Sequence, residues 1–141
     1  MTIIVVAVFG SAALHSNSQS ILGVRARIPF DFMVGDQIIP AGMVSARGVN
    51  TSNAGTLSIT NHSVNENIVR IGHRLPGTNI TKQGKLVFHR YGDRYYLAEV
   101  WVPGYKAWQV EESNSERAMK SERRFARNTR PRVVTVLAEI Q

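Results

Sequence analysis

The fold of this chain is decided by a stretch near its middle, residues 86–101, which reads LVFHRYGDRYYLAEVW. Two runs rich in β-branched and aromatic residues flank Gly92-Asp93, and this pattern predicts a β-hairpin. Glycine at the first central position of a two-residue loop suits a type II′ turn. Such a short loop also sets the register, which we expect to place Tyr91 opposite Arg94, His89 opposite Tyr96 and Val87 opposite Ala98.

Both faces of the predicted hairpin are largely apolar. One face carries Leu86, Phe88, Tyr95, Leu97 and Trp101, and the other carries Val87, Tyr96, Val100 and Val102. A pair of strands that is apolar on both sides is typical of the centre of a fold. We therefore expect the hairpin to form the core. Its aromatic side chains are then predicted to fill that core, although the alternative is a surface on which sugars or bases stack.

Further strands are predicted on both sides of the hairpin. Residues 24–34 alternate apolar and polar side chains, which indicates a half-buried strand, with Pro29 marking an edge or a bulge. Other strands are predicted over residues 43–49, 56–60, 67–75 and 133–140. The fold class is therefore mostly β: an antiparallel β-sandwich or small barrel of about seven strands, with one helix before the C-terminal strand.

That helix is predicted over residues 114–127, and it ends before Pro131. Ser113 and Glu116 form a capping box, with serine at the N-cap and glutamate three residues later. Apolar residues recur at helical spacing in the sequence Ala118, Met119, Phe125 and Ala126. We expect this apolar stripe, Met119 and Phe125 above all, to dock the helix on the sheet.

Length and composition limit the number of domains and the kinds of site that this chain can have. The chain has 141 residues, which fits a single domain over residues 19–141 once a leader is removed. It contains no cysteine, and this excludes disulfides, cysteine-type zinc sites and a thiol nucleophile. The formal charge of +7 is uneven, because residues 117–132 hold seven basic residues and a single acid, Glu122.

Residues 1–18 are predicted to be a signal peptide. Residues 1–20 carry no charged side chain, and the apolar run over residues 3–14 is of the length of a signal-peptide core and too short for a membrane span. Residues 16–18, Ser-Asn-Ser, supply a small-x-small cleavage pattern, and residues 11–13, Ser-Ala-Ala, are a second candidate.

The leader predicts export to the periplasm, the cell envelope or the extracellular space, with no transmembrane span in the mature chain. No basic residue precedes the apolar run, so it stays open whether Met1 is the true start. The alternative interpretation is a buried first strand over residues 3–9.

Three blocks resemble sequences of an uncharacterised family of short exported bacterial proteins. They are residues 24–36, VRARIPFDFMVGD, residues 40–42, PAG, and residues 86–97, LVFHRYGDRYYL. The similarity continues through the basic helix to residues 133–136, VVTV. The resemblance implies export and a single β domain. The family has no assigned activity, ligand or catalytic residue, so the resemblance implies no function.

The sequence contains no motif for catalysis or metal binding. His62, His73 and His89 lack the spacing of metal ligands, although the first two flank a predicted hairpin. Asp36 and Asp93 fall in Gly-Asp turns, where a carboxylate typically accepts from local amides. There is no nucleophile elbow and no phosphate-binding glycine loop. We therefore expect no cofactor, no metal and no enzymatic activity.

Two candidate contact surfaces remain. The first is a possible anion-binding set of basic residues: Arg117, Lys120, Arg123, Arg124, Arg127, Arg130 and Arg132. The second is a pair of aromatic residues, Tyr105 and Trp108, which are expected to be exposed because they lie beyond the predicted strands. For the basic set, the simpler interpretation is a solvated helix face whose ion pairs contribute little.

The function predicted from the sequence is that of a non-enzymatic envelope or extracellular module with a binding or structural role. One alternative is a weak polyanion binder that acts through the basic helix; its partner would be an anionic envelope component, with nucleic acid less favoured. The other alternative is a small hydrolase whose site the sequence does not reveal.

Overall fold

The computed structural model describes residues 22–49, 55–75, 81–104, 106–126 and 130–141. The predicted signal peptide, Tyr105 and Arg127 lie outside these ranges. The described elements follow in the order β1 (Gly23–Ile28), β2 (Phe32–Val34), β3 (Gln37–Ile39), β4 (Gly42–Gly48), β5 (Gly55–Asn61), β6 (Glu66–Arg74), β7 (Gly84–Tyr91), β8 (Arg94–Val102), β9 (Lys106–Val110), α1 (Asn114–Phe125) and β10 (Arg132–Ile140). The predicted fold class is confirmed: the chain is mostly β, with one helix directly before the last strand.

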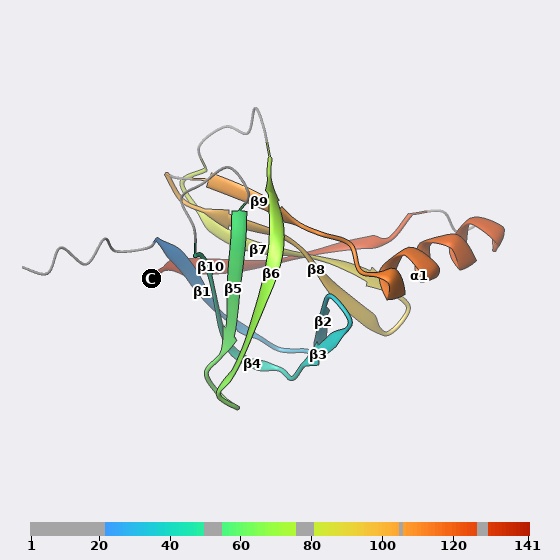
Figure 1. Ribbon diagram of the computed structural model, residues 1–141, viewed down its shortest axis with the longest axis horizontal. Helices are drawn as coiled ribbons and strands as arrows, with labels where there is room; N and C mark the ends of the chain where they lie inside the picture. Colours follow the sequence, from blue (N-terminus) through green and yellow to red (C-terminus); the bar gives the residue numbers. More distant parts are fainter. Residues whose placement is uncertain (1–21, 50–54, 76–80, 105, 127–129) are drawn as a thin grey trace, which may run out of the picture.

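Eight of the strands close into an antiparallel barrel. Their order is β8-β7-β10-β1-β4-β5-β6-β9, and β9 pairs back onto β8. Of the two predicted architectures, sandwich and small barrel, the structure is therefore the barrel. The short hairpin β2–β3 joins this ring through a parallel pairing of Met33 with Tyr96 of β8. Figure 1 shows α1 projecting beyond one end of the barrel.

Apolar side chains fill the barrel, as expected for eight strands. Strand β1 shows the pattern, because Val24, Ala26 and Ile28 are buried while the residues between them are exposed. Side chains of the β2–β3 hairpin, including Phe32 and Ile39, join the same buried cluster. The core is therefore shared by the barrel and the appended hairpin.

The predicted hairpin of β7 and β8 is confirmed near its turn. Gly92 has a φ of 61°, and Asp93 has no positive φ, as a type II′ turn requires. Tyr91 pairs with Arg94, and His89 pairs with Tyr96, in the predicted register. The prediction that the hairpin lies at the centre is also correct, since Leu86, Phe88, Leu97 and Val100 are all at most 3% exposed.

Further from the turn, the predicted register is wrong. Counted away from the turn, a β-bulge comes after the pair of Phe88 with Leu97. Val87 therefore pairs with Glu99 rather than with Ala98. The extra residue, Ala98, inverts the alternation of the rest of β8. As a result Val100 and Val102 join the core cluster in place of Trp101.

The strand predicted over residues 24–34 is in fact two strands. Strand β1 ends at Ile28, because Pro29 has no amide to donate to the ladder, and β2 begins at Phe32. In the bend between them, the ring of Phe30 stacks on Tyr95 with centroids 3.8 Å apart. The bend therefore directs an aromatic side chain onto the central hairpin.

Strand β9 was not predicted, and it corrects the expectation for Trp108. This side chain is 5% exposed and belongs to the core cluster. Glycines leave room for it: a Cβ on Gly55 would lie 2.7 Å from its Nε1 atom, and a Cβ on Gly48 would lie 3.2 Å from its ring. Trp108 is therefore part of the core and not an exposed contact residue.

Helix α1 begins as predicted but contacts the barrel differently. The Oγ atom of Ser113 accepts a hydrogen bond from the backbone N–H of Glu116 at 3.1 Å. The expected apolar docking stripe is wrong, because Phe125 is 89% exposed and Ala118 is exposed as well. The buried residue of the helix is instead Glu116, since polar side chains make the contact with the barrel.

Candidate functional site

A polar cluster fixes the first turn of α1 to the outer face of the β7–β8 hairpin. The carboxylate oxygen Oε1 of Glu116 lies 3.1 Å from Nδ1 of His89 and accepts a hydrogen bond from the hydroxyl of Tyr91 at 3.3 Å. At the preceding residue of the helix, Oγ of Ser115 and the hydroxyl of Tyr96 are 2.8 Å apart. Glu116 is only 4% exposed, so its charge is enclosed between the helix and the hairpin.

Tyr91 lies at the centre of this contact. Its ring meets that of Tyr96 edge-on, and the guanidinium of Arg123 lies over its other side, 5.6 Å from the ring centroid. Burial raises the pKa of the Tyr91 hydroxyl, and the nearby charge of Glu116 raises it further. Tyr91 is therefore held neutral, as a donor to the carboxylate.

These contacts decide which side of α1 faces the solvent. Glu116 and Arg123 are two turns apart and both touch the hairpin, so they define the side that faces the barrel. At 3.6 residues per turn, Ala118 and Phe125 fall on the opposite side, and both are exposed. The exposed side of the helix therefore ends in an aromatic ring.

The structure separates the predicted basic residues into groups with different surroundings. Lys120 is paired with the carboxylate of Glu112, and Arg123 is half-buried over Tyr91. The side chains that remain exposed are those of Arg117, Arg124, Arg130 and Arg132. Two members of the predicted set therefore contact other groups of the protein, and the anion-binding role of the others stays a prediction.

Two further arginines, which the sequence reasoning missed, belong to the same end of the barrel. Arg90 of β7 lies directly opposite Arg132 of β10, and its Nε atom donates to the carbonyl oxygen of Gly92 at 2.8 Å. The Nη2 atom of Arg123 lies 3.5 Å from the position that a Cβ on Gly92 would take. Arg94 follows the same turn and is exposed. The pairing of β10 with β7 creates this proximity, and no local sequence pattern signals it.

We call this surface the cationic end; it consists of Arg90, Arg94, Arg117, Arg123, Arg124, Arg130 and Arg132. Two exposed carboxylates, Asp93 and Glu122, are sequence neighbours of Arg94 and Arg123. Within the described part of the chain, the ion pairs closer than 4.0 Å are His89–Glu116 and Lys120–Glu112. The arginines of the cationic end therefore have no carboxylate partner among the described residues.

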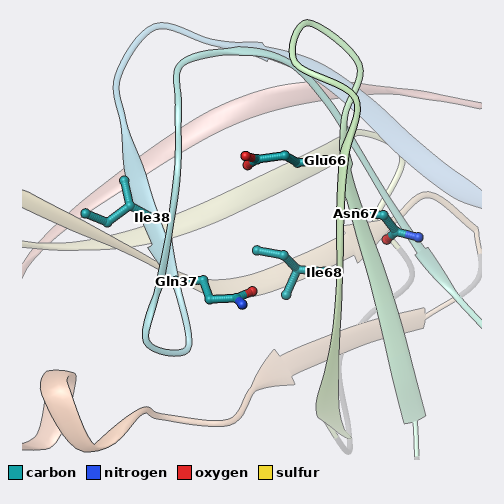
Figure 2. Close-up of a pocket in the computed structure, with 5 residues that line it drawn as sticks. All are labelled: Gln37, Ile38, Glu66, Asn67 and Ile68. Carbon is teal, nitrogen blue, oxygen red and sulfur yellow. The ribbon is translucent and has the colours of Figure 1, made fainter.

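A separate cavity of about 360 Å³ opens between the β2–β3 hairpin and β6. It is lined by Gln37, Ile38, Glu66, Asn67 and Ile68. Figure 2 shows Gln37 and Ile68 pointing toward each other across it. Glu66 is the single titratable group among these lining residues, so they offer no pair of groups for acid–base chemistry.

The histidines considered as metal ligands are not brought together. Nε2 of His62 lies 2.8 Å from Oγ of Ser45, beside the turn between β5 and β6. His73 lies at the far end of β6, opposite Gln109. Among the described residues, no group of three or more histidine, aspartate or glutamate side chains is arranged to hold a metal ion.

The aromatic residues of the hairpin contact other parts of the protein. Tyr91 and Tyr96 are each 1% exposed, and Tyr95 is stacked on Phe30. Trp101 donates from Nε1 to Glu99 at 2.7 Å, and the ammonium group of Lys85 lies over its ring. This confirms the expectation that these rings pack within the fold.

The structure is a small closed β-barrel that carries one projecting helix and the arginines of the cationic end. No protein-family model, curated protein or solved structure matches this chain. The resemblance to a family of exported proteins therefore stays a prediction and assigns no role to any residue. In the ranges that the structure describes, no helix has the length and apolar character needed to cross a membrane.

Proposed function

We propose that this protein is a non-enzymatic exported module that binds an anionic component of the cell envelope through its cationic end. The observation that carries the proposal is the way in which α1 is held. Its first turn is fixed to the hairpin by Glu116 and Ser115, Arg123 contacts Tyr91 of the hairpin, and the helix extends past the barrel. This arrangement leaves Arg117 and Arg124 exposed to the solvent, as are Arg94 of β8 and Arg132 of β10.

Repulsion among these arginines supports a binding role. Arg90 and Arg132 are directly opposite one another on neighbouring strands, a position in which like charges destabilise a sheet. The guanidinium of Arg123 approaches the same turn as that of Arg90. Asp93 and Glu122 are fewer than the arginines around them and, among the described residues, form no ion pair with them. A bound polyanion would neutralise them, which gives their proximity a function.

The polar cluster of His89, Tyr91 and Glu116 supports a structural role better than a hydrolytic one. A single oxygen of Glu116 accepts from both partners, and that oxygen holds the helix on the barrel. The hydroxyl of Ser115, the nearest serine in the cluster, is bonded to Tyr96 rather than to His89. We therefore keep the hydrolase only as the less favoured alternative.

The proposal is tested by retention on a heparin column. A variant carrying Arg94→Gln, Arg117→Gln, Arg124→Gln and Arg132→Gln should elute at clearly lower salt than the wild type, because phosphate- or sulfate-like contacts depend steeply on salt. The matched control carries Arg25→Gln, Arg27→Gln, Arg74→Gln and Lys82→Gln, which are equally exposed and remove the same charge elsewhere. Elution of both variants at the same salt concentration would show that only net charge matters and would overturn the proposal.

A further inference from the structure

The outermost feature of the cationic end is an aromatic side chain without cover. Phe125 is 89% exposed, the largest exposed fraction among the described large hydrophobic residues. Phenylalanine is usually buried in soluble proteins, so such a position invites an explanation. The contacts of Glu116 and Arg123 with the hairpin turn Phe125 away from the barrel and prevent it from folding back onto the core.

Two exposed cations lie on one side of this ring, and the exposed carboxylate of Glu122 lies on the other. Arg117 and Arg124 lie about two turns apart along the helix, about a quarter turn from the line through Ala118 and Phe125, and both are exposed. A helix with an exposed apolar side and basic residues beside it is typical of segments that lie in the interface of an anionic bilayer. The apolar side is short, so the charges would supply much of the attraction.

We propose that α1 docks on an anionic lipid surface, with Phe125 inserted among the acyl chains and Arg117 and Arg124 on the lipid phosphates. This inference rests on the proposed function and names its partner. A soluble polyanion would neutralise the arginines but would leave Phe125 in water, whereas a lipid surface accommodates both. The projection of α1 beyond the barrel leaves the helix free to meet a flat surface (Figure 1).

The first experiment measures co-sedimentation of the full chain with vesicles. Vesicles of equal parts phosphatidylglycerol and phosphatidylcholine are compared with vesicles of phosphatidylcholine alone. Phe125→Ala should lower partitioning onto the anionic vesicles about tenfold, from the loss of one inserted aromatic side chain. Ile38→Ala, which removes a 66% exposed apolar side chain from β3, is the control and should leave partitioning unchanged. All variants share residues 1–21, so any contribution of the apolar run over residues 3–14 is the same in each.

A second measurement reports on residue 125 directly. In a Phe125→Trp variant, tryptophan emission beyond that of the wild type should shift to the blue when anionic vesicles are added, because the indole leaves water. Heparin should produce no such shift. A shift with vesicles supports insertion, and the absence of any shift overturns it.

These experiments distinguish failure of the lipid-docking proposal from failure of the broader proposal that the cationic end binds an anionic component. If Phe125→Ala reduces partitioning while its elution from heparin stays that of the wild type, the lipid surface is supported. If Phe125→Ala partitions like the wild type, the lipid inference is overturned, and the heparin comparison of arginine variants still decides the broader proposal. Unchanged far-ultraviolet circular dichroism of Phe125→Ala, expected for so exposed a residue, excludes loss of the helix as the cause.

Discussion

Oε1 of Glu116 lies 3.1 Å from Nδ1 of His89, across 27 residues of sequence. A carboxylate oxygen accepts hydrogen bonds, and an imidazole that carries its proton on Nδ1 donates to it. The contact joins the first turn of α1 to the third residue pair from the turn of the β7–β8 hairpin. The side chains of Glu116 and His89 are 5% and 23% exposed. This contact, rather than apolar packing, sets the direction in which the cationic helix leaves the barrel.

Loss of that carboxylate should destabilise the protein. Glu116→Ala would leave the Tyr91 hydroxyl and the His89 ring without their shared acceptor, and we expect a loss of about 1–3 kcal/mol in the free energy of unfolding. Urea denaturation measures this change. Glu122→Ala removes an exposed carboxylate from the same helix and should stay within about 0.5 kcal/mol of the wild type. Equal effects of the two substitutions would contradict the structural role of Glu116.

The raised pKa of Tyr91 predicts a loss of stability in alkaline solution. Burial, reinforced by the charge of Glu116, lifts this pKa above its ordinary value of 10.0. Because the hydroxyl then ionises more readily in the unfolded chain, stability is complete below pH 10 and declines as the pH rises toward the folded-state pKa. Urea midpoints between pH 8 and pH 11 should fall less in Tyr91→Phe than in the wild type. Parallel midpoints over that interval would refute the prediction.

The central position of the hairpin predicts large effects of core truncation. Phe88 and Leu97 are 0% and 3% exposed, and replacement of either by alanine should cost about 2–5 kcal/mol. Phe125→Ala is the natural control, since it removes an aromatic side chain from the solvent rather than from the core. A cost below about 0.5 kcal/mol for Phe88→Ala in denaturant melts would show that the hairpin is peripheral.

The proposed export predicts a shortened N-terminus. The uncharged apolar run over residues 3–14 and the small residues after it predict cleavage, and the mature chain should begin between Leu14 and Gln19. Intact-mass analysis of protein from the envelope or medium fraction gives the answer. Recovery of the complete chain from the cytoplasm would show that these residues are not a leader.

Local chemistry explains the parts of the fold that the sequence predicts. The turn at Gly92 needs a positive φ, and the cap at Ser113 needs a side-chain acceptor, and both requirements are visible in a few adjacent residues. The bulge at Ala98 has no comparable sign, because alanine fits a regular strand equally well. The sequence therefore does not predict it, although it decides which side chains of residues 99–102 face the core.

Long-range packing explains the parts that sequence reasoning missed. Trp108 is buried because glycines on other strands have no side chain in the space that its ring occupies. The residues around Trp108 in the sequence do not indicate this. Phe125 suits a docking stripe by its spacing, yet the helix is fixed by Glu116 instead. The cationic end likewise depends on the pairing of Arg90 with Arg132, which are far apart in the sequence.

Closure of the barrel has a consequence for how copies of this protein behave toward one another. Among the described strands, β3 alone has a single neighbour, and it is three residues long. Open strand edges are the places where β-rich chains recruit further chains into growing fibrils. A ladder that closes on itself leaves this one short strand and partial edges such as residues 66–71 of β6. Even when concentrated on a surface, folded copies are therefore poor seeds for edge-to-edge polymerisation.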